Sequence, residues 1–219
     1  MIKNNLKEYG KYIRLQESQR RYIFLLITST IVLVLSGLLV FNKEFFVNIE
    51  RPIFEFFNDM PQILHGIMIV ITQFGGLVGV IFWMAAGWYL VNKRAAISVF
   101  WTGLLTWILA LFAKDWFDRG RPFSLLNNVN ITENFSGNGF PSGHSSLSAA
   151  CATVLYYQVP KKYRKYILLI ILLVGISRIY LGAHFPLDVV GGWAFGAFMG
   201  SIAMLLLSIS RNKSPTTRS

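Results

Sequence analysis

The sequence predicts an all-α protein, a polytopic membrane bundle of six transmembrane helices with an interfacial helix between the first and second spans. Composition is the first reason, because hydrophobic residues make up 54% of the 219 residues and charged residues only 14%. A soluble domain usually carries more charge and fewer apolar side chains. The apolar residues also gather in long segments, and the basic residues gather between those segments. The length suits a single domain.

Six segments are apolar enough to cross a bilayer, which takes about 20 helical residues. The predicted spans are Ile23–Phe41, Gly75–Val91, Ala96–Phe112, Ser145–Tyr157, Tyr166–Tyr180 and Leu187–Ile209. In the fourth span we expect Ser145, Ser146 and Ser148 to face other helices, as small residues of membrane helices often do. In the sixth span, Gly192, Gly196 and Gly200 have the spacing of close helix packing.

The segment Glu50–Gln73 is apolar and helical in pattern, but its apolar part is short for a span and contains His65 and Gln73. We expect a helix that lies at the interface or packs against the bundle. A seventh span here would reverse the side on which every later loop lies, so the distribution of basic residues must decide.

Lys and Arg accumulate in cytoplasmic loops. In the six-span arrangement, segments 1–22, 92–95, 158–165 and 210–219 fall on one side and hold 15 of the 21 basic residues. We therefore expect a cytoplasmic N-terminal segment at 1–22, a membrane domain at 23–209 and a cytoplasmic tail at 210–219. The net charge of +11 is then a topology signal that also attracts anionic lipid headgroups. It does not indicate a nucleic-acid partner.

The opposite, outer side carries a group of charged residues near the ends of spans, where charge is costly and tends to mark function. Lys114 and Arg121 are seven residues apart, about two helical turns, so we expect them to share one helix face. Gly120 and Pro122 are expected to end that helix, since the residue before proline avoids the helical region.

Two further segments reach the same level. Ser142 is a good helix N-cap for the fourth span, and the free N–H groups that follow it, including that of Gly143, suit an anion. Arg178 ends the fifth span, and His184 and Asp188 follow it. Pro186 suits the first turn of the sixth span, which would bring Asp188 within reach of one imidazole nitrogen of His184.

Cations, a helix N-terminus and two imidazoles together suit phosphoryl transfer. The phosphoryl group carries charge on its equatorial oxygens, which fixed cations stabilise. A neutral histidine oriented by an aspartate can act as nucleophile. A second, protonated histidine, His144 in this sequence, can supply a proton to the leaving group.

Three motifs carry a family resemblance. They are Lys114–Pro122 (Lys, six residues, Arg-Pro), Pro141–His144 (Pro-Ser-Gly-His) and Ser177–Asp188 (Ser-Arg, five residues, His, three residues, Asp). All three match without gaps, in order and at membrane edges on the same predicted side. They resemble the signature of the type 2 phosphatidic acid phosphatase family, which is related to the vanadium haloperoxidases. The resemblance covers roughly residues 60–208. The single-domain size suggests a bacterial protein.

The resemblance implies roles for individual residues. His184 would be the nucleophile, Asp188 would orient it, and His144 would be the general acid. The phosphate-binding residues would be Lys114, Arg121, Ser142, Gly143 and Arg178. The family needs no metal and no other cofactor, so none is expected here. Arg119 lies outside the fixed motif positions, and we expect it to contact solvent or headgroups.

The leading hypothesis is a metal-independent lipid phosphatase of the cell membrane, acting on a lipid phosphate or diphosphate of the outer leaflet. Undecaprenyl diphosphate is favoured because its diphosphate is generated at the outer face; phosphatidic acid and phosphatidylglycerol phosphate are alternatives. A phosphate-lipid transporter or flippase would need charges deep inside several spans, which the sequence lacks. A phosphotransferase that passes phosphate to a lipid or sugar acceptor stays open, as does the oligomeric state.

Overall fold

The computed structural model describes residues 2–41, 43–132 and 135–212, with side chains for 16–41, 47–132 and 135–210, and every regular element in them is helical. Most of the expected tail, 213–219, lies outside the described residues. The helices are α1 (Ile2–Phe41), α2 (Lys43–Asn58), α3 (His65–Gln73), α4 (Leu77–Leu90), α5 (Lys93–Phe117), α6 (Pro122–Leu125), α7 (Gly143–Tyr156), α8 (Lys161–Tyr180) and α9 (Pro186–Asn212), with a 3₁₀ turn at Gln62–Leu64.

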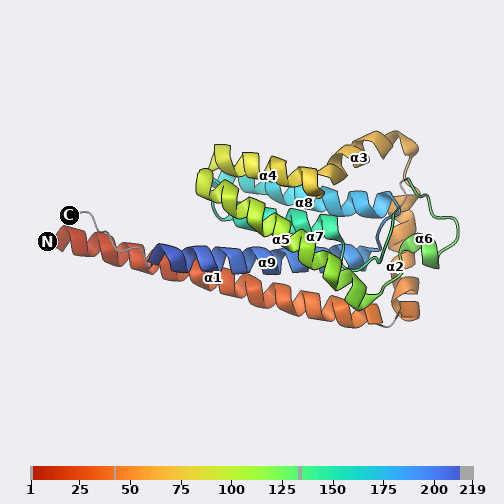
Figure 1. Ribbon diagram of the computed structural model, residues 1–219, viewed down its shortest axis with the longest axis horizontal. Helices are drawn as coiled ribbons and strands as arrows, with labels where there is room; N and C mark the ends of the chain where they lie inside the picture. The colour runs from red at the N-terminus through yellow and green to blue at the C-terminus, as the bar shows by residue number, and fades with distance from the viewer. Residues whose placement is uncertain (1, 42, 133–134, 213–219) are drawn as a thin grey trace.

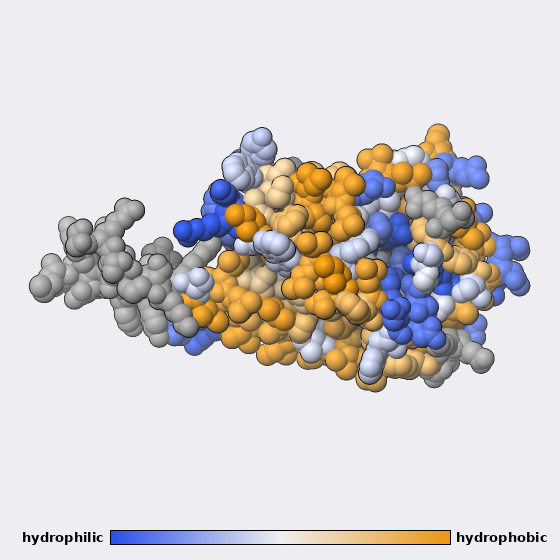
Figure 2. All heavy atoms as spheres, viewed as in Figure 1, coloured by the Kyte–Doolittle hydropathy of each residue, from blue (hydrophilic) through white to orange (hydrophobic). Residues whose placement is uncertain are grey.

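Six of these helices form a lengthwise bundle. Helix α7 packs against α5, α8 and α9, α1 packs along α9, and α4 packs along α5 (Figure 1). Helix α2 lies across one end of the bundle, near α6, while α1 begins and α9 ends at the opposite end. Apolar side chains cover the middle of the visible face, and hydrophilic ones gather at the end that carries α2 and α6 (Figure 2). This distribution is typical of a helical bundle whose middle part is surrounded by lipid.

Helix α7 forms the centre of the bundle. Ser145, Ser146 and Ser148 are fully buried, which confirms that the serines face other helices. The approach of α9 to α7 is very close, because a Cβ atom added at Gly196 would lie 2.1 Å from the carbonyl oxygen of Ser146. Added Cβ atoms at Gly192 and Gly200 would also lie 2.6 Å from the N-cap residue Ser142 and from Thr153 of α7, respectively. The predicted role of these glycines in close packing is therefore confirmed.

Length and apolar composition alone identify fewer spans than the six predicted. Among the described residues, three segments pass as spans, namely Gln16–Phe41, Lys93–Leu125 and Pro186–Ser210. Helices α3 and α4 count as a fourth if they are one span bent by 64°. Helix α7 has 14 residues, about 21 Å of helix, which is short of the roughly 30 Å hydrocarbon core. The protein is a helical membrane protein, and the number of six spans stays a prediction.

The single helix expected over Glu50–Gln73 is wrong in its extent. The structure breaks it into α2 and α3 around Pro61, whose ring fixes φ and supplies no N–H for a continuing helix. The Asn58 side chain fixes the break by donating to the carbonyl oxygens of Asn130 and Tyr180, both at 2.9 Å. As a result α2 packs on α8 and α9 at the bundle end, and α3 packs on α8.

Candidate active site

The polar end of the bundle holds a cavity of about 480 Å³ beside α5 and α7. Six of the eight residues predicted for the site line it: Lys114, Arg121, Gly143, His144, Arg178 and His184. The segment Phe135–Asn138 forms another wall, and Trp107, Ala110 and Leu111 form an apolar wall along α5. Asp188 and Ser142 do not line the cavity. Asp188 contacts His184 on the side away from it, and Ser142 is the buried residue that precedes α7.

Lys114 and Arg121 reach this cavity from two different elements. Helix α5 ends at Phe117, and Asp118 adopts a left-handed conformation with φ of 44°. Arg121 is instead the N-cap residue of α6, with Pro122 in the first turn. The expectation that both cations share a face of one helix is therefore wrong, because the left-handed residue turns the chain before Gly120. The two side chains converge through that turn.

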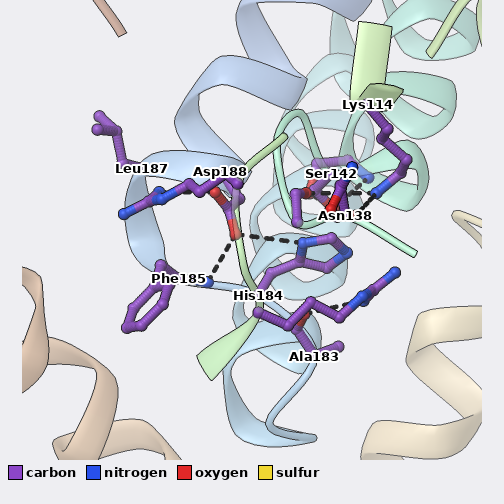
Figure 3. Close-up of polar contacts among 12 residues, drawn as sticks. Lys114, Asn138, Ser142, Ala183, His184, Phe185, Leu187 and Asp188 are labelled. Carbon is purple, nitrogen blue, oxygen red and sulfur yellow. Dashed lines mark hydrogen bonds and ion pairs between the residues drawn. The ribbon is translucent and has the colours of Figure 1, made fainter. Parts of the chain in front are cut away.

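His184 lies between the ends of α8 and α9, with Asp188 one helical turn further along. The Nδ1 atom of His184 is 3.4 Å from Oδ2 of Asp188, and the same oxygen accepts a hydrogen bond of 3.0 Å from the N–H of Phe185 (Figure 3). Pro186 begins α9, as predicted, which sets this i, i+4 arrangement. Burial lowers the pKa of His184 well below its ordinary value, with Asp188 acting in the opposite direction. A neutral imidazole at neutral pH follows.

His144 occupies the first turn of α7, and its ring packs edge-on against Trp107, with the ring centres 5.4 Å apart. Ser142 caps this helix, as predicted, by accepting a hydrogen bond of 3.4 Å from the N–H of Ser145. The Ser142 side chain is fully buried. The cap therefore fixes the direction in which the first turn of α7 presents His144 to the cavity.

The two cations from the α5–α6 region bind carbonyl oxygens of the chain around them. Lys114 Nζ donates to Asn138 at 2.7 Å and to Gly139 at 3.3 Å. Arg121 donates to the carbonyl oxygens of Ser136, Gly137 and Ala183, at 2.8 to 3.0 Å. These bonds hold the segment before α7 against the cavity and fix the ammonium and guanidinium groups in place.

Arg178 reaches the cavity from the last turn of α8, and the sequence analysis missed two of its contacts. Its Nη1 atom donates to Thr72 Oγ1 on α3 at 2.9 Å. The ring of Phe135 lies 5.1 Å from the Arg178 guanidinium carbon and 5.6 Å from that of Arg121. Phe135 thus forms cation–π contacts with both arginines. Nothing in one sequence marks Thr72 or Phe135 as neighbours of these residues.

The structure contradicts the expectation that Arg119 contacts solvent or headgroups. Arg119 is 1% exposed; its Nη1 atom donates to Asp188 Oδ1 at 2.6 Å, and its Nη2 atom pairs with Glu50 on α2. A buried guanidinium requires such partners, because an unpaired charge is costly away from water. Burial raises the pKa of the Glu50 carboxyl, and Arg119 opposes that shift. The sequence analysis missed Glu50, although a carboxylate near a predicted membrane edge is itself a signal.

Within the described residues, no three His, Cys, Asp or Glu side chains come together in a way that could hold a metal ion. The cationic groups that face the cavity are Lys114, Arg121 and Arg178. With His144 and His184 on the same cavity, the arrangement has what an anion-binding site with acid–base groups requires.

Comparison with known proteins agrees with this arrangement. A PAP2 superfamily domain matches residues 94–211, which include all three motifs. The chain belongs to the PAP2 superfamily. Phosphatidylglycerophosphatase B of Bacillus subtilis is 34% identical over 159 residues, covering 62% of this chain and 71% of that protein. An undecaprenyl-diphosphatase of Sulfolobus acidocaldarius is 25% identical over 173 residues, covering 77% of this chain and 79% of its own.

A solved PAP2 structure shares the fold. The transmembrane PAP2-type phosphatidylglycerolphosphate phosphatase of Bacillus subtilis superposes with a TM-score of 0.68, covering 89% of this chain and all of that one at 22% identity. The PAP2 membrane fold is therefore shown for this chain. The identity of the family confirms the resemblance that the three motifs carry.

Proposed function

We propose that this PAP2 superfamily member is a lipid phosphatase that hydrolyses a lipid phosphate or diphosphate through a phosphohistidine at His184. One observation carries the proposal: His184, with Asp188 behind it at 3.4 Å, opens onto a cavity that three cationic side chains also line. The names of the two relatives described above support a phospholipid or polyprenyl diphosphate as the substrate class.

In the first step, Nε2 of His184 attacks phosphorus while the bond to the lipid oxygen breaks. Asp188 accepts the hydrogen bond from Nδ1–H, which leaves the Nε2 lone pair free and stabilises the positive charge that the ring gains. Burial and the facing cations lower the pKa of His144, and the negative charge of a bound phosphate favours its protonated form. In that form His144 transfers its proton to the departing oxygen. Lys114, Arg121 and Arg178 stabilise the equatorial oxygens, with the N–H groups at the start of α7, including that of Gly143.

In the second step, water attacks the phosphoryl group on His184 and the N–P bond breaks. His144, now neutral, removes a proton from the water and so returns to its starting state. His184 recovers its lone pair, and inorganic phosphate leaves with the added oxygen. The reaction needs no metal in this account, because three cationic side chains supply the charge that a metal ion otherwise supplies.

The phosphate is expected at headgroup level on the outer face of the membrane, with six spans and both termini in the cytoplasm. The basic segments between spans support this orientation. The apolar wall of Trp107, Ala110 and Leu111 suits the part of a lipid next to its phosphate. Undecaprenyl diphosphate is the favoured substrate, with phosphatidylglycerol phosphate and phosphatidic acid as the alternatives.

A panel of lipids tests the proposal. The purified full chain in detergent micelles is given each of the three lipids, and released phosphate is measured over time. Wild type is expected to release phosphate from at least one lipid, His184→Ala to lose the activity, and His65→Ala to keep it. His65 is the matched control because it lies on α3, outside the cavity. Absence of release from all three lipids would overturn the proposal.

A further inference from the structure

A chain of buried charges extends from the proposed nucleophile to α2. Asp188 divides its carboxylate: Oδ2 faces His184, and Oδ1 accepts from Nη1 of Arg119 at 2.6 Å. The second terminal nitrogen of Arg119 pairs with Oε2 of Glu50. Every charged member of this chain is buried, with exposed fractions of 5% for Glu50, 1% for Arg119 and 0% for Asp188. These three buried charges therefore link α2, the α5–α6 turn and α9 through charged contacts alone.

Glu50 also fixes the start of α9. Its Oε1 atom accepts a hydrogen bond from the N–H of Leu187, one of the first-turn donors that has no partner within the helix. The guanidinium carbon of Arg119 lies 4.9 Å from the centre of the Phe185 ring. Residues on both sides of Pro186 are thus held by the same pair. On the other side of this segment, Arg121 donates to the carbonyl oxygen of Ala183 at 3.0 Å.

We propose that Glu50 and Arg119 are positioning residues for the reaction at His184, acting through Asp188. This inference rests on the proposed function. The planar guanidinium holds two carboxylates at once, which a lysine, as a point charge, does not reproduce. Asp188 then has one oxygen fixed by Arg119, and its other oxygen stays directed at Nδ1 of His184.

Charge balance gives Glu50 a second role. With both carboxylates ionised, Glu50, Arg119 and Asp188 together carry one net negative charge, and the ring of His184 gains positive charge as the N–P bond forms. That net charge stabilises the phosphohistidine state. If Arg119 faced Asp188 without Glu50, the guanidinium would cancel the carboxylate, and the stabilisation would be weaker. Neither residue lines the cavity, so substrate binding should depend little on them.

The test compares kcat and KM of full-length variants on whichever lipid the wild type hydrolyses. Arg119→Lys keeps the positive charge but loses the planar guanidinium that contacts both carboxylates. Glu50→Gln keeps the size of the side chain but loses its negative charge. Each is expected to lower kcat on the order of 10- to 100-fold, the scale seen when residues that orient metal ligands lose their partners, while KM stays close to that of wild type. Because both residues act through Asp188, the loss of kcat in the double variant should be no greater than the loss in the less active of the two single variants.

The neighbouring pair Arg51 and Glu55 on α2 supplies the matched control. It is also an ion pair, at 2.7 Å, but its side chains are 52% and 44% exposed and lie outside the charge chain. Arg51→Lys and Glu55→Gln should leave kcat and KM unchanged. Thermal unfolding in detergent, run on every variant, separates loss of folded protein from loss of rate.

The outcomes distinguish failure of the positioning role from failure of the proposed function. Wild-type kcat in folded Arg119→Lys and Glu50→Gln would overturn the positioning role and leave the proposed function standing. A rise in KM with unchanged kcat, or additive losses in the double variant, would also overturn it. If Arg119→Lys fails to fold, Glu50→Gln alone decides by the same criteria. A wild type that releases no phosphate from any lipid would instead overturn the proposed function.

Discussion

The Nδ1 atom of His184 lies 3.4 Å from Oδ2 of Asp188, four residues further along, where α9 begins at Pro186. Both side chains are buried, yet His184 opens onto the cavity and Asp188 does not. Asp188 therefore orients the imidazole through Nδ1, and Nε2 stays available to attack phosphorus. This arrangement is the geometric basis of the proposed mechanism and of the first two predictions.

Replacing Asp188 by Asn should lower kcat by about 10³- to 10⁴-fold, the scale seen when a catalytic histidine loses its orienting carboxylate. The amide can donate to Nδ1, which would favour the tautomer with the proton on Nε2, where attack requires a lone pair. Phosphate release from the preferred lipid measures the effect, with His65→Ala as control. An Asp188→Asn enzyme with a tenth or more of wild-type kcat would contradict the orienting role.

The pH dependence of kcat/KM should show an acid limb below pH 6.5, the ordinary pKa of histidine. Burial, Lys114 and Arg121 lower the pKa of His184, and its hydrogen bond to Asp188 raises it, with a net lowering. The neutral, nucleophilic form therefore persists as pH falls, and on the acid side activity is lost when pH passes below the lowered pKa of His184. An acid limb at pH 7 or above would show that a different group controls the free enzyme.

Gly139 should be essential for the position of Asp188. A Cβ atom added there would lie 2.9 Å from Asp188 Oδ2, so Gly139→Ala must displace either the carboxylate or the backbone before Phe140. We expect a loss of kcat of roughly 10- to 100-fold, the scale of small misplacements of a catalytic group. Gly66→Ala is the control, because an added Cβ meets nothing within 4 Å. Equal kcat for the two variants would contradict this contact.

The packing of α7 on α9 should be sensitive to one methyl group. In Gly196→Ala the new Cβ would lie 2.1 Å from the backbone oxygen of Ser146, which cannot move without its helix. Overpacking of this kind costs about 1–3 kcal/mol, so thermal unfolding in detergent should occur at lower temperature than for wild type or Gly66→Ala. An unchanged unfolding temperature would mean that α7 and α9 lie further apart than the structure has them.

Removal of metal ions should leave the activity intact. Lys114, Arg121 and Arg178 supply the positive charge in the proposed mechanism, so treatment with EDTA and assay in chelated buffer should give the wild-type rate. Vanadate should inhibit, since its trigonal-bipyramidal form resembles the phosphoryl group in transfer. A large loss of activity in EDTA that added Mg²⁺ restores would contradict the metal-free mechanism.

The sequence predicts the class of fold and most of the cavity lining, because both depend on local features. Long apolar segments identify helices such as α1 and α9, and the spacing of His184 and Asp188 across Pro186 places one beside the other. The ends of helices were predicted less well. The left-handed conformation of Asp118 ends α5 before Arg121, and Pro61 divides the helix expected across it.

Contacts between distant segments could not be predicted from one sequence. Glu50 and Arg119 are separated by 69 residues and meet only because α2 crosses the end of the bundle. Their pairing changes Arg119 from an expected surface residue into a buried one. The same limit explains why Phe135, in a loop with no regular pattern, was not expected between Arg121 and Arg178.

Trapping of the intermediate tests the central claim most directly. The purified protein is mixed with a lipid carrying ³²P in its transferred phosphate, quenched in alkali within one turnover, and the labelled residue is identified by peptide mapping. The account predicts alkali-stable, acid-labile label on His184 of the wild type and of His65→Ala, and none in His184→Ala. Label on another residue, or turnover by His184→Ala at the wild-type rate, would contradict it.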